Sequence, residues 1–246
     1  MTDLLGKRAL VTGGSRGIGA AIALALAKNG ADVAISYEAS ADRALKVVTA
    51  IKAMGRSALA VQADAADPEA NARLVEDAVA GLGGIDILVN NAGTIRHGNM
   101  AEMSLQDVDT ILHVNIRGTV LTTRAAIPHL AAGGRIITIG STRGDRVPFA
   151  GVTMYGLSKS AHHSFTRGLA RELGPAQVTV NLVQPGPIDT ELNLSDAEPA
   201  DHIRSLVPLG RYGTTEEVAH VVSFLASPAS SFVTGSVITV DGGMNA

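Results

Sequence analysis

The sequence predicts a doubly wound α/β fold, in which a parallel sheet of seven strands carries helices on both faces. Three observations support this fold class: short apolar runs are separated by segments of helical period, these runs are nearly continuous, and a glycine-rich turn follows the first of them. Continuous apolar strands indicate burial on both faces, as in a parallel sheet covered by helices. The intervening segments are long enough for the crossover helices that parallel strands require.

The predicted strands are separated by helical segments along the whole chain. The strands are expected at Arg8–Thr12, Val33–Tyr37, Ala58–Gln62, Ile85–Asn90, Arg135–Ser141, Val178–Val183 and Val237–Val240. Helices are expected at Gly17–Asn29, Ala41–Met54, Pro68–Gly81, Leu105–Leu130 and Val152–Leu173. Such a succession is typical of doubly wound sheets.

The chain of 246 residues shows no linker, repeat or break in composition, so residues 1–246 are expected to form a single domain. Residues 185 to about 212 lack clear periodicity. Because a long irregular stretch inside a domain is usually a functional loop, we expect a substrate loop at about 189–212.

Composition excludes several classes of function. The hydrophobic share of 46% and charged share of 17% fit a soluble enzyme, and a net charge of −3 without a basic run gives no reason to expect a nucleic-acid polymer as partner. The absence of cysteine excludes disulfides, thiolate zinc sites and a cysteine nucleophile, and no histidine spacing predicts a catalytic metal. No apolar run reaches the roughly 20 residues that span a membrane, and no signal peptide is expected, so a cytoplasmic location is the default.

The glycine-rich turn lies between the first strand and the first helix, with Gly13, Gly17 and Gly19 in a G-x-x-x-G-x-G spacing. Glycine lets the backbone turn tightly and approach a pyrophosphate, while a helix N-terminus offers unpaired N–H groups. The alternative is an ordinary glycine-rich turn, but the strand–turn–helix setting favours a dinucleotide site. The expected contact residues are Gly13, Ser15, Arg16, Gly17, Ile18 and Gly19.

Five motifs occur in order along the chain: the turn at 12–19, NNAG at 90–93, Ser141, YGLSK at 155–159 and PGPIDT at 185–190. Together they resemble the short-chain dehydrogenase/reductase family over essentially the whole chain. The resemblance implies a Rossmann fold and a nicotinamide-dependent oxidoreductase.

Tyr155 and Lys159 are four residues apart, so they share one face of a helix. The phenol pKa near 10 is too high for a base at neutral pH, but a lysine ammonium within about 4–6 Å lowers it. Tyr155 then takes a proton from an alcohol or gives one to a carbonyl. A lone Tyr-x-x-x-Lys is also explained by a helix-surface pair; Ser141, fourteen residues upstream, and the glycine-rich turn favour the catalytic interpretation.

The resemblance assigns roles to this set and adds further residues. It implies that Tyr155 transfers the proton, that Lys159 binds the nicotinamide ribose, and that Ser141 orients the substrate oxygen. Asn115 matches the asparagine that completes a water-linked proton relay to the lysine.

More cofactor contacts follow from the resemblance. Asp64 matches the residue that binds the adenine amino group, although a helix cap or turn residue is the alternative interpretation. The other matching positions are Asn91, Ala92 and Gly93 after the fourth strand, and Pro185, Gly186, Ile188 and Thr190 on the nicotinamide side.

The end of the second strand bears on the choice of cofactor, because an acidic residue there would bind the ribose diol and repel a 2′-phosphate. By resemblance Ser36 occupies that place, and Arg16 is placed to pair with the phosphate. Glu38 is interpreted as a solvated loop carboxylate. We therefore expect NADP(H) as the preferred cofactor, with NAD(H) as the weaker alternative.

The leading hypothesis is reversible hydride transfer between NADP(H) and a small-molecule carbonyl or secondary alcohol. Residues 140–148 and 183–190 also resemble acyl-carrier-protein reductase-like members and a bacterial member described as binding cyclic di-GMP. A ligand-sensing protein on the same fold, binding cyclic di-GMP, is therefore the alternative, since fold alone does not decide function.

Four basic residues lie near the expected substrate mouth, either as anion-binding groups or as solvated charge: Arg96, His97, Arg143 and Arg146. The resemblance implies a homotetramer, with a dimer second.

Overall fold

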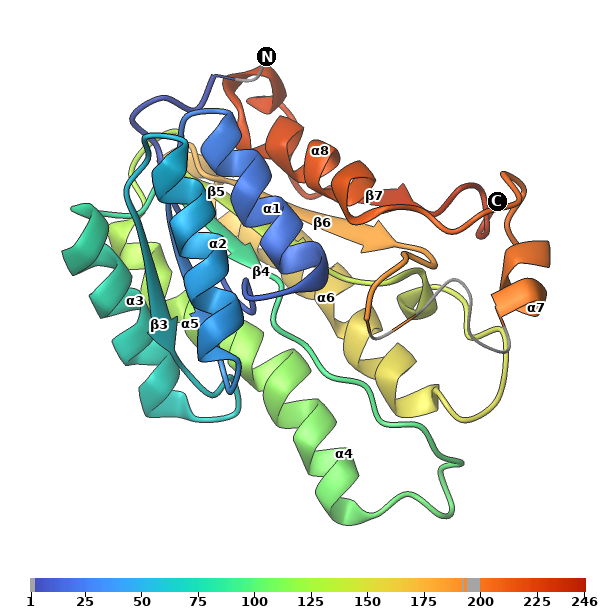
Figure 1. Cartoon of the computed structure of the whole chain (residues 1–246). Coiled ribbons are helices and arrows are strands. Elements are labelled where there is room, and N and C mark those ends of the chain that lie inside the picture. Colours follow the sequence, from blue (N-terminus) through green and yellow to red (C-terminus); the bar gives the residue numbers. More distant parts are fainter. Residues whose placement is uncertain (1–2, 192, 194–199) are drawn as a thin grey trace.

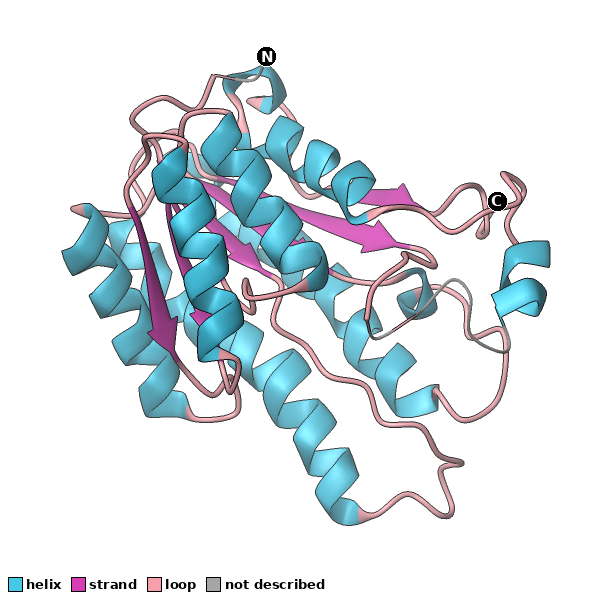
Figure 2. Ribbon diagram, in the orientation of Figure 1, coloured by secondary structure: helices cyan, strands magenta, loops and turns pink. Residues whose placement is uncertain are grey.

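The computed structural model describes residues 3–191, 193 and 200–246, and its seven strands form one sheet between two layers of helices (Figures 1 and 2). All neighbouring strands pair in parallel, in the order β3-β2-β1-β4-β5-β6-β7. The strands are β1 (Arg8–Val11), β2 (Asp32–Tyr37), β3 (Ala58–Gln62), β4 (Ile87–Asn90), β5 (Arg135–Ile139), β6 (Thr179–Pro185) and β7 (Val237–Val240).

Helices connect most of these strands. The helices are α1 (Gly17–Lys28), α2 (Ala41–Ala53), α3 (Pro68–Leu82), α4 (Leu105–Ile111), α5 (Thr119–Ala126), α6 (Thr153–Leu173), α7 (Ala200–Ser205) and α8 (Thr215–Ala226). Local sequence explains several of their ends: the Asp67 carboxylate accepts from Glu69 N–H at the start of α3, and Thr214 with Glu217 forms a capping box at the start of α8. Among the described residues, no helix has both the length and the apolarity needed to cross a membrane.

Two apolar cores hold the helices against the sheet. Helices α1, α2 and α8 cover one face, through side chains such as Ile22 and Val222. Helices α3, α5 and α6 cover the other, through side chains such as Leu74 and Leu169. Burial on both faces explains the nearly continuous apolar strands in the sequence. The predicted fold class is confirmed.

The strand order positions the site. From β1 the chain winds outward to β3 and then returns to place β4 on the other side of β1. Loops that leave the carboxyl ends of β1 and β4 therefore diverge, which opens the crevice where doubly wound sheets bind their ligands.

The structure corrects some predicted boundaries. β5 ends at Ile139 instead of Ser141, because Ser141 caps a short 3₁₀ turn at Thr142–Gly144. β6 runs on to Pro185, which was expected to begin an irregular segment. The expected single helix from 105 to 130 is α4, a π-helical segment (Leu112–Gly118), α5 and a 3₁₀ turn (Ile127–His129).

Candidate cofactor and active site

The glycine-rich turn adopts a backbone conformation that favours glycine. Gly13 and Gly17 have φ angles of +62° and +53°, in the left-handed region. A Cβ atom on Gly19 would lie 2.4 Å from the side-chain nitrogen of Asn91. α1 begins at Gly17, and its N-cap residue Arg16 makes no side-chain hydrogen bond to the first turn. The turn and the uncapped helix end therefore form a cradle that fits a pyrophosphate.

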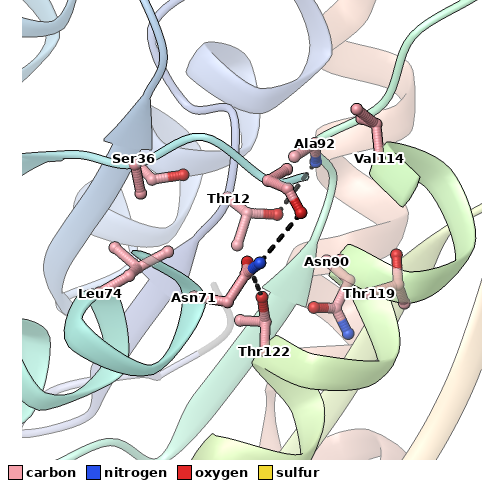
Figure 3. A pocket seen from close by; sticks show the side chains of 12 residues that line it. Thr12, Ser36, Asn71, Leu74, Asn90, Ala92, Val114, Thr119 and Thr122 are labelled. Atoms are coloured by element: carbon pink, nitrogen blue, oxygen red, sulfur yellow. Dashed lines mark hydrogen bonds between the residues drawn. The ribbon is translucent and has the colours of Figure 1, made fainter. Parts of the chain in front are cut away.

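Thr12 ties this turn to the segment after β4. Its hydroxyl oxygen accepts hydrogen bonds from the backbone N–H groups of Asn91 and Ala92, both at 2.9 Å. The Asn91 side-chain amide donates in return to the carbonyls of Thr12 at 2.9 Å and Gly13 at 3.1 Å. Figure 3 shows Thr12 beside a small polar cavity behind the turn. The cavity volume of about 10 Å³ holds at most one water molecule. These contacts fix the shape of the turn.

Ser36 is buried and accepts hydrogen bonds from the glycine-rich turn. Its side chain is 4% exposed and lines the same cavity. The hydroxyl oxygen accepts the Gly13 N–H at 3.0 Å, and the Ser36 carbonyl accepts the Gly14 N–H at 2.8 Å. Neighbouring Tyr37 points to the other face of the strand. The structure thus gives Ser36 a supporting role, and its expected contact with the adenosine ribose remains a prediction.

Arg16 shares a carboxylate with Arg43 at the start of α2. Nη1 of Arg16 lies 3.7 Å from Oε2 of Glu191, and Arg43 Nη1 donates to the same oxygen. This contact keeps the pKa of Glu191 below its usual value, the hydrogen bond from Arg43 being the largest cause. Just before Glu191, Thr190 Cγ2 lies 3.7 Å from where a Cβ on Gly17 would stand. The segment after β6 therefore meets the glycine-rich turn, a contact that the sequence did not predict.

Asp64 lies directly after β3, at an opening of about 530 Å³ that Glu38 and residues of α4 also line. Its Oδ1 accepts the Ala66 N–H at 2.8 Å, as a turn residue would. Glu38 is exposed, which agrees with a solvated loop carboxylate. Both interpretations of Asp64 fit this position, so its contact with adenine remains a prediction.

The remaining residues of the PGPIDT motif are held by β7 and its surroundings. Gly186 N–H donates to Val240 at 2.9 Å, and a Cβ on Gly186 would lie 2.6 Å from Cβ of Asp241. Ile188 forms an isolated parallel bridge with Gly213. The expected substrate loop at 189–212 contains α7, while its residues 192 and 194–199 lie outside the described part of the chain.

Ser141, Tyr155 and Lys159 converge beyond the carboxyl end of β5. The Ser141 hydroxyl accepts the Arg143 N–H at 3.2 Å and forms a side-chain hydrogen bond with Tyr155. Lys159 is 5% exposed, and its Nζ donates to the Ile139 carbonyl at 2.9 Å. The same Nζ lies 5.8 Å from the centre of the Tyr155 ring. The structure thus brings Ser141, from just beyond the end of β5, to Tyr155 and Lys159, which the sequence placed on one helix face.

Burial dominates the pKa of Tyr155. Desolvation raises this pKa above its ordinary value, while the positive charge of Arg143 and the hydrogen bond with Ser141 act in the opposite direction. Desolvation also lowers the pKa of Lys159 to about 8. The expected net lowering of the Tyr155 pKa by Lys159 is therefore not observed, and Arg143 is the cation that acts on the phenol.

Asn115 lies in the π-helical segment and is almost fully buried. Its Oδ1 accepts the Thr94 N–H at 2.8 Å, and its Nδ2 donates to Ser158 Oγ at 2.9 Å. A Cβ on Gly93 would lie 3.4 Å from Asn115 Oδ1 and 3.5 Å from Lys159 Nζ. Asn115 and Lys159 thus approach the same glycine, and the water-linked relay between them remains a prediction.

A chain of polar side chains behind Ser141 was not predicted from the sequence. The Gln184 side-chain amide is fully buried; it donates to the Ser141 carbonyl at 3.0 Å and lies 2.7 Å from Nε2 of His163. Nε2 of His163 lies 3.4 Å from Asp145 Oδ1. A glutamine inside the apolar run of β6 was the available signal, since a buried amide requires hydrogen-bond partners.

The other residues noted near the substrate mouth differ in their surroundings. Arg96 lies 3.4 Å from Asp107, and the Arg143 guanidinium stacks 5.1 Å from the centre of the Phe149 ring. His97 and Arg146 are exposed. Only Arg143 acts on the candidate proton-transfer residue.

Comparisons with known proteins agree with this geometry. Residues 13–245 match the family model described as enoyl-(acyl carrier protein) reductase. A short-chain dehydrogenase from Burkholderia cenocepacia J2315, solved in complex with NADP, is 51% identical, with 99% of each chain covered and a TM-score of 0.98. The chain belongs to the short-chain dehydrogenase/reductase family.

Two curated relatives of this family have names that describe different functions. The cyclic-di-GMP-binding biofilm dispersal mediator protein of Escherichia coli K12 is 43% identical over 100% of both chains. Versicolorin reductase 1 of Aspergillus parasiticus is 41% identical over 97% of this chain and 96% of its own.

Membership of the short-chain dehydrogenase/reductase family confirms the resemblance seen in the sequence motifs, and with it the oxidoreductase class. The roles of individual site residues are a separate matter and remain predictions.

Proposed function

We propose that the protein transfers a hydride between NADP(H) and a small-molecule carbonyl or secondary alcohol, with Tyr155 as proton donor and acceptor. The observation that carries this proposal is the convergence of Ser141, Tyr155 and Lys159 beyond β5, next to the glycine-rich cradle. Three observations support NADP(H) as the cofactor. Arg16 is a cation in the glycine-rich turn, and position 36 holds a serine in place of an acidic residue. The Burkholderia relative was solved in complex with NADP. NAD(H) is the weaker cofactor.

The side chains support a simple proton path. When bound, the reduced nicotinamide supplies the hydride. Ser141 donates a hydrogen bond to the substrate oxygen, and the Tyr155 hydroxyl gives its proton to that oxygen. The phenolate left on Tyr155 is stabilised by the positive charge of Arg143. Lys159, with a pKa of about 8, still carries its ammonium charge at neutral pH.

A panel of ketones and aldehydes, assayed by NADPH oxidation, tests the proposal. We expect consumption of NADPH with at least one carbonyl class and slower consumption of NADH. A chain that binds NADPH but reduces none of a broad panel would count against the enzymatic function.

A ligand-sensing role is the second candidate, because the Escherichia coli relative is named for binding cyclic di-GMP. Calorimetry with cyclic di-GMP on the same preparation distinguishes the two functions. Micromolar binding together with an inactive carbonyl panel would favour the sensor, whereas turnover without binding favours the enzyme.

We also infer a homotetramer of single-domain subunits spanning residues 1–246, in the cytoplasm. The edge strand β7 is only partly buried, and Phe224 on α8 and Phe232, in the segment between α8 and β7, are exposed. Leu157 on α6 is half-exposed as well, so two separate surfaces carry apolar side chains that a symmetric assembly would cover. Light scattering at micromolar concentration checks the assembly, and a strictly monomeric protein would contradict it.

A further inference from the structure

Two arginines from different elements converge on one carboxylate at the edge of the cofactor cradle. Arg16 is the N-cap residue of α1, and Arg43 lies in the first turn of α2. Both approach the same oxygen of Glu191, which belongs to the segment after β6. All three side chains are about half-exposed. We call Arg16 and Arg43 the arginine pair.

The position of the arginine pair suits a phosphate monoester. α2 follows β2 directly, and in doubly wound folds the adenosine ribose of a dinucleotide lies at the end of the second strand. The N-cap residue of α2, Ser40, makes no side-chain hydrogen bond to its helix, so the positive end of the helix dipole adds to the two guanidinium groups. Guanidinium groups match phosphate oxygens through paired hydrogen bonds.

We propose that Glu191 competes with the 2′-phosphate of NADP(H) for the arginine pair, and that Arg43 is a second residue that binds this phosphate. The proposal rests on NADP(H) as the cofactor of the proposed function. A carboxylate carries one negative charge, whereas a phosphate monoester carries about −1.5 to −2 and offers three acceptor oxygens. The phosphate therefore displaces Glu191, and NADH, which lacks it, leaves the Glu191 contact in place.

Titration with two pairs of probes isolates the contribution of the phosphate. NADPH is compared with NADH, and 2′,5′-ADP with 5′-AMP, on the full-length wild-type protein and its variants. Arg43→Ala should weaken NADPH and 2′,5′-ADP about 10-fold, because a charge-assisted hydrogen bond is lost, and should change NADH and 5′-AMP less than about twofold. Arg73→Ala is the matched control, since Arg73 is an exposed, ion-paired arginine on α3.

Glu191→Gln gives the sharper test because its expected effect is a gain. An exposed ion pair is worth at most about a fivefold change in an equilibrium, so NADPH and 2′,5′-ADP should bind about two- to fivefold tighter. NADH and 5′-AMP should be unaffected, and Glu69→Gln on α3 is the control. In the double variant with Arg43→Ala the gain should shrink, because Glu191 competes partly through Arg43.

The outcomes separate this inference from the choice of cofactor. If wild-type protein prefers NADPH but Glu191→Gln leaves 2′,5′-ADP binding unchanged or weaker, the competition is wrong and the cofactor assignment stands. If Arg43→Ala binds 2′,5′-ADP as well as wild type does, Arg43 is no phosphate ligand. Wild-type protein that binds NADPH no tighter than NADH would overturn both.

Discussion

The two ends of the candidate site are built in opposite ways. At the catalytic end, Ser141 and Lys159 are buried, and desolvation shifts the pKa values of Tyr155 and Lys159. At the adenosine end, Arg16 and Glu191 are about half-exposed and their charges face solvent. One end is held by packing and buried hydrogen bonds, and the other by solvent-exposed ion pairs.

This difference indicates how each end responds to change. Interactions between exposed charges are weak and screened by salt. Removing the partner of a buried polar group costs the full desolvation free energy of that group. Substitutions at the catalytic end should therefore have large effects that depend little on ionic strength. Substitutions at the adenosine end should have modest effects that fade as salt is added.

The largest expected effect is that of Tyr155→Phe, which keeps the ring but removes the ionisable oxygen. General acid–base catalysis typically contributes 10²–10⁴-fold, so kcat for carbonyl reduction should fall by about that factor. NADPH affinity, measured by fluorescence titration, should barely change. Near-normal turnover by this variant on a verified substrate would mean that another group transfers the proton.

A smaller effect is expected for Arg16→Ala at the adenosine end. The loss of one charge-assisted hydrogen bond should weaken NADPH binding about 10-fold and leave NADH binding nearly unchanged. Because Arg16 is exposed, the difference between wild type and variant should shrink as sodium chloride is raised from low to high concentration. A salt-independent difference would show that Arg16 acts through the shape of the glycine-rich turn.

Ser36→Ala tests the link between the second strand and that turn. The substitution removes the acceptor of the Gly13 N–H, so the free energy of unfolding should fall by about 1 kcal/mol. NADPH and NADH should weaken by similar factors, since the turn serves both. Urea denaturation and cofactor titration measure the two quantities, and a selective loss of NADPH would instead support direct contact with the 2′-phosphate.

The fold and the proximity of Ser141, Tyr155 and Lys159 were accessible from the sequence because their signals are local. Strand periodicity located β1 to β7 within a few residues, and the i,i+4 spacing put Tyr155 and Lys159 on one helix face. The strand-end position of Ser141 then followed approximately, with an error of two residues in the end of β5.

Contacts between distant segments were not accessible in this way. Arg43 and Glu191 are 148 residues apart, and nothing in either local pattern indicates that they meet. The same holds for Gln184 and Ser141, which are 43 residues apart. The direction of the Tyr155 pKa shift was also missed, because spacing reports which groups are near but not how much water their packing removes.

The smallest effect, and the most specific one, concerns Arg143, the cation that acts on the Tyr155 phenol. Arg143 lowers the pKa of Tyr155 against the larger effect of burial, so Arg143→Gln should raise that pKa further. Oxidation of a secondary alcohol requires the phenolate, so its kcat/KM should begin to rise at a higher pH than in wild type. Carbonyl reduction requires the protonated phenol, so its activity should persist to a higher pH. Arg146→Gln, in the same loop but exposed, is the control and should leave both profiles unchanged. An Arg143→Gln profile that coincides with that of wild type would show that the charge of Arg143 does not reach the proton-transfer step.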